Sequence, residues 1–202
     1  MNHPWYASER EVLVFIHSNT EWILKQQRLR KSQKEYFGIN QEITTREHQL
    51  KIVSVEKGKV QAVLKGREVT LTIPVDVDIT EDRVQAFIRK VIIEMCRKDA
   101  RNYLPQRTAE LARLHGFHFQ KVVLKNLKSK WGSCSSLGNI NLNVHLMRLP
   151  DHLIDFILLH ELVHTKHMNH GPQFWALLND VTGGKARQLD REMKAQGKLI
   201  LK

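Results

Sequence analysis

The chain has 202 residues, 42% of them hydrophobic, which suits a domain of ordinary size with its own core. It contains no apolar run of 18 or more residues, so the sequence predicts no membrane span. The formal net charge of +11 favours anionic partners, but Lys and Arg are spread along the chain, and the densest patch, Lys25 to Lys34, holds only five. We interpret the charge mainly as a solvated basic surface that permits weak, charge-driven binding of nucleic acids or nucleotides.

Two features bear on the compartment. The first residues, "MNHPWYASEREVLVFIHS", lack the basic start and uninterrupted apolar run of a signal peptide. Cys96 and Cys134 lie far apart in the sequence and form no disulfide framework. We therefore expect a cytoplasmic protein; the sequence does not indicate its oligomeric state.

The N-terminal third of the chain predicts a helix followed by strands. Residues 8–37 carry apolar side chains at spacings of three, four and seven, and Ser8 with Glu11 has the pattern of a capping box at the helix start. Residues 40–75 are rich in Val, Ile, Leu and Thr, with turn signals at "EKGK" and "KGRE". This pattern predicts three or four antiparallel strands joined by hairpins.

Helical spacing returns after residue 80. Thr80 and Asp82 are typical helix-start residues, and an apolar stripe follows them. Pro105 is expected to kink or stop this helix, so that "QRTAELARLHG" forms a second helix that ends at Gly116.

The last third predicts a hairpin and three helices. Two alternating segments, residues 117–127 and 140–147, flank the Gly/Ser-rich turn "WGSCSSLGN" and predict a hairpin. "PDHLIDFILLHELVHTKH", "QFWALLNDV" and "KARQLDREMKAQ" then predict helices, with a break at "MNHGP". The order of elements indicates an α+β fold, with helices packed on a small antiparallel sheet.

One helix carries a metal-binding pattern. His160 and His164 are four residues apart and share a helix face, so both imidazoles can bind one ion at about 2.0–2.1 Å. Glu161 lies beside the first histidine and is placed to exchange protons with a water molecule at the metal. This is the HExxH arrangement, in which the glutamate is the general base.

The third ligand is a choice between His167 and His170. His167 shares the helix face, but seven residues of helix separate it from His160 by about 10.5 Å, too far for one ion without strain. If the helix ends before Gly171, with Asn169 tolerating a left-handed backbone, the chain can return His170 to the metal. We predict His170 as the ligand, and His167 as an outer-shell, substrate-facing or surface residue. Three protein ligands and an open position indicate a catalytic Zn²⁺ site.

Four segments carry a resemblance to a known family. They are "KSKWGSC", "GNINLN", "LPDHLIDFILLHELVH" and "NHGPQFW", which keep the order and spacing of the YgjP-like metallopeptidase family, distantly related to SprT-like and WLM zinc peptidases. The resemblance covers about residues 80–180. It implies a zincin-like fold with an HExxH active-site helix, zinc on His160, His164 and His170, Glu161 as base, and peptide or protein substrates.

The resemblance also suggests a domain organisation. Residues 80–202 would form the zincin-like metallopeptidase domain, and residues 1–79 an N-terminal helix and antiparallel strands. This N-terminal part is expected to be shortened, because family members usually carry leading Arg-containing strands before the helix that "FIHSNTEWILKQQ" resembles.

Candidate substrate-binding residues follow from the same comparison. In a zincin, the strand beside the active-site helix often lies along the cleft as an edge, so "NINLNVH" would offer its backbone at Leu142 and Asn143. Trp131 and Trp175 are candidates for the cleft wall, although each indole is more often a core residue. The group that stabilises the oxyanion stays open among four residues: Lys130, His145, His167 and Tyr103.

Three functions compete at this point. The first is a zinc-dependent peptidase that uses a metal-activated water. The second is a metal-dependent hydrolase of a nucleotide or another phosphoanhydride, which is weakened by the absence of a GxxxxGK[ST] phosphate loop. The third is a nucleic-acid-associated protein whose metal site acts on bound proteins, although the sequence has no zinc finger or RNA-binding aromatic signature.

Overall fold

A computed structural model describes residues 8–24 and 36–200 of the chain. The chain divides into two compact units, residues 1–35 and residues 36–202. In the first unit, helix α1 (Glu9–Ser18) begins with the expected capping box, in which the Glu11 amide donates to the Ser8 hydroxyl and the Ser8 amide donates to the Glu11 carboxylate. The helix is interrupted at Asn19, and residues 20–24 are helical again. The predicted continuous helix is therefore wrong at this point, and its remainder in residues 25–35, with the Lys25–Lys34 patch, lies outside the described residues.

The second unit begins with a four-stranded sheet: β1 (Glu42–Thr44), β2 (Gln49–Val55), β3 (Gln61–Lys65) and β4 (Glu68–Pro74). The strand order is β1-β2-β4-β3, and β2 pairs with β4 in parallel. The hairpin at "KGRE" is confirmed, with Gly66 at φ 63° in the turn between β3 and β4. The second expected hairpin is wrong, because the chain after β2 crosses to the far side of β4, so the sheet is mixed.

Helix α3 (Asp82–His115) is a single helix of 34 residues. It ends at Gly116, whose φ of 65° gives the expected left-handed C-cap. Pro105 lies inside the helix, so the predicted break there is wrong. Buried side chains on both sides of the proline, Leu104 and Thr108 among them, hold the helix against the core and outweigh the lost backbone hydrogen bond.

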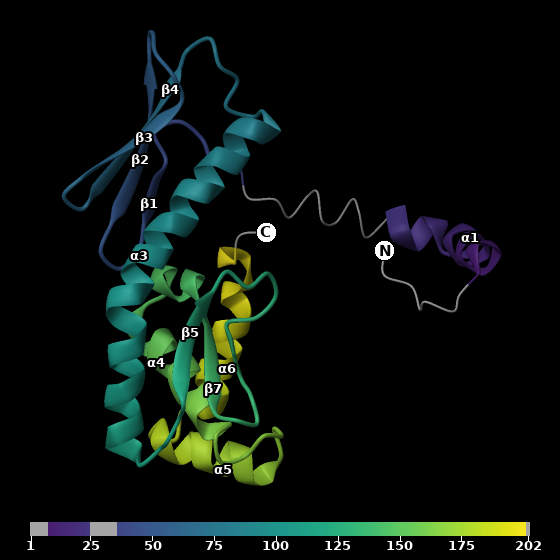
Figure 1. Ribbon diagram of the computed structural model, residues 1–202, viewed down its shortest axis with the longest axis vertical. Coiled ribbons are helices and arrows are strands. Elements are labelled where there is room, and N and C mark those ends of the chain that lie inside the picture. Colours follow the sequence, from purple (N-terminus) through teal and green to yellow (C-terminus); the bar gives the residue numbers. More distant parts are fainter. Residues whose placement is uncertain (1–7, 25–35, 201–202) are drawn as a thin grey trace. The chain divides into compact units, whose positions relative to one another are not determined.

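Asp99 fastens α3 to the first sheet. Its carboxylate is fully buried and accepts hydrogen bonds from the Thr45 hydroxyl and the Glu47 amide, and it contacts His48 Nδ1 at 2.5 Å. Figure 1 shows the N-terminal half of α3 crossing this sheet and its other half running beside β5 and α4. One apolar cluster joins both regions, so the unit has a continuous core.

A second sheet lies beside the C-terminal half of α3, with β5 (Lys121–Lys125), β7 (Asn139–Asn143) and β6 (Gly132–Cys134) in that order. β6 and β7 form an antiparallel hairpin, while β5 pairs with β7 in parallel. The predicted pairing of residues 117–127 with the strand before the histidine helix is therefore wrong in direction. That strand is also shorter than expected, because residues Val144–Arg148 form a 3₁₀ helix, η1.

The chain ends with α4 (Asp151–Val163), α5 (Pro172–Val181), α6 (Ala186–Ala195) and the 3₁₀ helix η2 (Gln196–Leu199). α4 is nearly enclosed, and nine of its residues are buried. The predicted α+β fold class is confirmed, although both sheets are mixed where antiparallel pairing was expected. Among the described helices, none is long and apolar enough to cross a membrane.

Candidate metal centre

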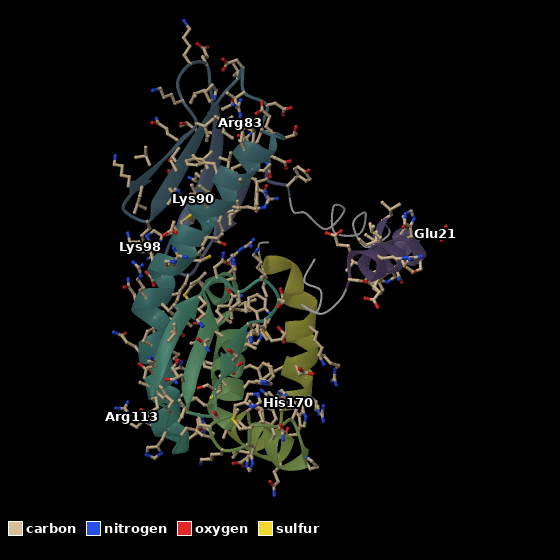
Figure 2. The ribbon with its side chains drawn as sticks, turned by 45° about the vertical axis from the view of Figure 1, so that its right-hand side comes forward. Glu21, Arg83, Lys90, Lys98, Arg113 and His170 are labelled. Atoms are coloured by element: carbon tan, nitrogen blue, oxygen red, sulfur yellow. The ribbon has the colours of Figure 1, made fainter. Side chains whose placement is uncertain are left out.

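Three imidazoles converge at the junction of α4 and α5. His160 lies in the last turn of α4, His164 is the C-cap of that helix, and His170 lies in the connection to α5. One ring nitrogen from each lies within 4.8 Å of the others. The Nε2 atoms of His160 and His170 are 3.0 Å apart, close to the roughly 3.3 Å that two nitrogens adopt around a tetrahedral zinc ion. Figure 2 shows His170 beside the lower helices of the unit, away from the four-stranded sheet.

The connection between α4 and α5 returns His170 to the helix. α4 ends at Val163, and the amide of Lys166 donates to the Val163 carbonyl in the turn that follows. The Gly171 amide then donates to the Asn169 carbonyl at 2.8 Å, directly before Pro172 opens α5. The helix ends before Gly171, as predicted. Asn169 does not adopt the left-handed backbone that it would tolerate, because Asn40 is the sole non-glycine with positive φ in residues 8–24 and 36–200.

The backbone of His167 orients His164. Its carbonyl oxygen lies 3.1 Å from His164 Nδ1, so Nδ1–H donates to it and Nε2 keeps its lone pair for an ion. The His167 side chain is not part of the three-imidazole group. The contribution of His167 to the site is therefore its backbone carbonyl, which the sequence could not show because every residue type has one.

Phe174 packs against the three rings. It is fully buried, and its ring centroid lies 4.9 Å from that of His160 and 4.6 Å from those of His164 and His170. The neighbouring Trp175 is half-buried, and its ring centroid lies 6.4 Å from that of His170. The Arg187 guanidinium lies 3.6 Å from the centroid of the Trp175 ring. An apolar support of this kind keeps the imidazoles in place without competing for their lone pairs.

Burial favours the neutral form of two of these imidazoles, His160 and His164. Burial, and then the charges of His164 and His170, lower the pKa of His160 to about 3. Burial also lowers the pKa of His164. A neutral imidazole offers the lone pair that a metal ion needs, and nitrogen donors suit zinc among the transition metals. The donor set therefore fits a metal ion.

Glu161 lies next to the first imidazole and is 4% exposed. Burial raises the pKa of its carboxyl to about 8, opposed by the charge of Lys130. Oε2 has no hydrogen-bond partner among the described side chains and backbone. This carboxylate is thus held in a dry position, free to accept a proton.

Gly132 on β6 makes room for this carboxylate. A Cβ at residue 132 would lie 2.6 Å from Glu161 Oε1 and 2.8 Å from its Cδ, closer than real Cβ atoms come. The glycine of "WGSC" therefore has a steric function that we did not predict. Its place within the expected turn "WGSCSSLGN" and the segment "KSKWGSC" gave the only signals in the sequence.

The strand β7 does not lie at an edge. It is central, with Leu142 paired to Leu124 of β5 on one side and to Gly132 of β6 on the other. The expectation that Leu142 and Asn143 offer free backbone to a substrate is therefore wrong. Both are fully buried, and the Asn143 side chain donates to the carbonyls of Leu127 and Lys130. Among the described strands, β6 is the edge beside Glu161.

The four candidates for the oxyanion group separate in space. Tyr103 contacts the Arg46 guanidinium, and Arg46 pairs with Asp151 at the start of α4. Asp151 lies about 13.5 Å along the helix axis from His160, so Tyr103 is far from the three imidazoles. His145 is fully buried and its Nε2 bonds to Asn126. Lys130 and His167 remain, and the charge of Lys130 acts on Glu161.

Comparison with known proteins identifies the family. The sequence matches the YgjP-like family, metallopeptidase domain, over residues 2–196. The chain belongs to the YgjP-like family. No curated protein matches at a significant level. Two solved structures are similar: the metallopeptidase zymogens abylysin of Pyrococcus abyssi (26% identity, TM-score 0.40, 45% of this chain and 91% of that chain) and jannalysin of Methanocaldococcus jannaschii (22%, 0.40, 45% and 93%).

The YgjP-like family is a metallopeptidase family. Its substrates are therefore peptides or proteins, and its chemistry requires a metal ion. Among the described residues, His160, His164 and His170 form the one group of three or more side chains whose geometry could hold a metal ion. The match extends through the N-terminal segment, whereas the motifs that carry the resemblance lie in residues 128–175.

Proposed function

We propose that this chain is a zinc-dependent peptidase in which His160, His164 and His170 hold the ion and Glu161 is the general base. The observation that carries this proposal is the convergence of three ring nitrogens within 4.8 Å, with a buried carboxylate on the next residue. Catalytic zinc sites have three protein ligands and one open position, whereas structural sites are closed by four.

Bound zinc supplies a Lewis acid that lowers the pKa of water and polarises the substrate carbonyl. Glu161 takes the proton from the attacking water and donates it to the amine that leaves. A pKa raised by burial suits this exchange near neutral pH, and a cation at the imidazoles favours the ionised form. Gly132 leaves the carboxylate its place, because a Cβ at residue 132 would lie 2.6 Å from Oε1.

The edge of β6 is the proposed place for the substrate backbone. Residues Gly132–Cys134 pair on one side with β7, so an extended peptide can add to their other side through main-chain hydrogen bonds. Lys130, which precedes this strand, is the proposed donor to the oxyanion. His167 is the alternative, and a Lys130→Gln variant with unchanged kcat would favour it.

Hydrolysis by the zinc-loaded protein tests the proposal. An unstructured protein and a set of nucleoside triphosphates are offered side by side, and we expect cleavage of the protein alone. Glu161→Gln should keep zinc and lose hydrolysis by at least about a hundredfold. If only nucleotides are cleaved, the peptidase proposal is wrong and the phosphoanhydride alternative takes its place. If Glu161→Gln hydrolyses the protein as fast as the wild type, Glu161 is not the general base.

A cytoplasmic location stays a prediction. Cys96 and Cys134 are both free thiols, as expected from their spacing, and Cys96 is buried. Burial raises the pKa of the Cys96 thiol to about 12, so this side chain acts as a small apolar group in the core.

A further inference from the structure

A pocket of about 390 Å³ opens beside the metal centre, and His160 forms part of its wall. Its volume lies within the range of about 300–1,000 Å³ that is typical of ligand pockets. The pocket is built from α4, from the loop before β6, and from α6 with η2. It therefore lies between the active-site helix and the C-terminal end of the described chain.

The floor of the pocket is apolar. Phe156 and Ile157 lie one turn before His160 on α4, and the rings of Phe156 and His160 contact each other edge to face at 6.1 Å. Met193 of α6 and Ile200 after η2 complete the floor, and all four side chains are buried. Trp131, half-buried, forms a wall. These surfaces favour an apolar side chain, because its binding removes apolar surface of both partners from water.

The rim of the pocket is polar and carries cations. Lys128 and Lys194 are exposed there, and the Lys194 ammonium pairs with the Asp190 carboxylate at 2.7 Å. With Lys194 paired to Asp190, the rim has a net positive charge from Lys128. This charge repels a basic side chain, and the apolar floor offers such a side chain no partner. An acidic side chain can reach the rim, but its burial on the floor would cost its hydration.

We propose that this pocket binds a large apolar side chain of the substrate, such as Phe, Leu or Met, on the residue directly beside the bond that is cut. Because His160 is shared by the pocket and the metal centre, a side chain in the pocket belongs to a residue next to the metal. The inference rests on the proposed peptidase function, since it names the side chain that the same site selects.

Cleavage mapping gives the first measurement. The zinc-loaded full chain digests an unstructured protein, and mass spectrometry locates the cuts. We expect one position flanking the cut to be enriched in large apolar residues. In matched peptides, kcat/KM should be at least about tenfold higher for Phe than for Ala at that position, and Lys should be worse than Ala. Cuts without apolar enrichment at either flanking position would overturn the proposal.

Variants of Met193 test the pocket itself. Met193→Trp should fill the floor and reverse the preference, so that Ala exceeds Phe in kcat/KM, and zinc content should not change. Met193→Ala should enlarge the pocket and keep the preference for large side chains. Leu189→Ala lies on the same helix but does not line the pocket, and it is the matched control. An unchanged preference in Met193→Trp would overturn the assignment.

A binding measurement separates this inference from the peptidase function. In zinc-loaded Glu161→Gln, N-acetyl-phenylalaninamide should shift the NMR signal of the Trp131 indole N–H, assigned with Trp131→Phe, whereas N-acetyl-lysinamide should not. If the wild type cleaves no peptide and the Phe probe still shifts Trp131, the peptidase proposal fails and the pocket assignment stands. Hydrolysis without any shift of Trp131 by the Phe probe would overturn the pocket assignment alone.

Discussion

Gly132 on β6 lies against the side chain of Glu161 on α4, and the space between them does not admit a Cβ. Gly132→Ala should displace the Glu161 carboxylate, because Oε1 lies 2.6 Å from the position that the new methyl carbon takes. A shift of about 1 Å at a catalytic group can cost on the order of a hundredfold in rate. We expect kcat to fall about 10- to 100-fold while zinc content stays the same.

Steady-state kinetics and metal analysis of one preparation check this prediction. Gly38→Ala is the control, because nothing lies within 4 Å of a Cβ there and the backbone is not left-handed. Full activity in Gly132→Ala would show that Glu161 does not need the position seen in the structure.

His145 is a second buried residue with a measurable consequence. It is fully buried, its Nε2 bonds to Asn126 Oδ1, and its Nδ1 has no hydrogen-bond partner among the described atoms. Burial, and then the charge of Arg148, lower its pKa from 6.5 to about 4. Below pH 6.5 the unfolded chain takes up a proton that the folded protein refuses, so stability falls as the pH drops towards 4.

The loss from this one group is at most about 3 kcal/mol, at 1.36 kcal/mol for each pKa unit. Urea unfolding between pH 7 and pH 4 measures it by comparison with His145→Gln, whose amide can still donate to Asn126. We expect the variant to lose less stability over this range than the wild type. Parallel curves for the two proteins would contradict the buried neutral imidazole.

Side chains at the metal centre were easier to predict than backbone contributions. Helical spacing placed His160 and His164 on one face, and the distance along a helix argued against His167. The carbonyl of His167 and the missing Cβ of Gly132 contribute through the backbone. The carbonyl is common to every residue type, and a glycine within an expected turn is explained by the turn alone, so neither contribution was predicted.

At the scale of elements, the helix α3 contains a proline, Pro105, and continues through it to His115. Pro105 has no amide hydrogen, so the carbonyl of Arg101, four residues earlier, lacks its helical donor. Pro105→Ala should restore this hydrogen bond and raise the free energy of unfolding by about 1–3 kcal/mol. Equilibrium urea denaturation measures the change. A lower stability would mean that the half-buried proline ring contributes more through packing than the helix loses.

The predictions of helices and strands succeeded where one periodicity dominated. Six segments with helical spacing give α1, α3, α4, α5 and α6, because the two predicted on either side of Pro105 form the single helix α3. The start of α1 and the end of α3 are as expected, whereas α1 ends at Ser18, earlier than predicted. Strand pairing was wrong twice, for β2 with β4 and for β5 with β7. Alternation predicts that a strand has one buried face, but it does not say which strand lies beside it in the sheet. The partner is set by packing on α3, which involves residues far apart in the sequence.

At the scale of the whole molecule, basic side chains follow the exposed face of α3. Arg83, Lys90 and Arg101 share one face by helical spacing, and all are exposed. Figure 2 shows Arg83, Lys90 and Lys98 along this helix. We keep weak nucleic-acid binding as a prediction and assign it to this face. The affinity for a DNA duplex should fall steeply with salt and show no sequence preference.

Lys90→Glu, Lys98→Glu and Arg101→Glu together should reduce the slope of log K against log salt by about 2–3. Lys57→Glu, Lys59→Glu and Lys65→Glu make the same change in net charge on exposed parts of the first sheet, and they should reduce the slope less. Fluorescence anisotropy over a series of salt concentrations measures both. An equal effect of the two triple variants would attribute binding to net charge and not to α3.

The proposed metal centre lies where α4 meets α5, and its proposed third ligand, His170, lies in the connection between these helices. Metal analysis of the purified protein and two variants tests this arrangement most directly. We predict one zinc ion per chain in the wild type and in His167→Ala, whose remaining backbone carbonyl still orients His164, and loss of zinc in His170→Ala. Zinc retained by His170→Ala and lost by His167→Ala would contradict the proposed centre.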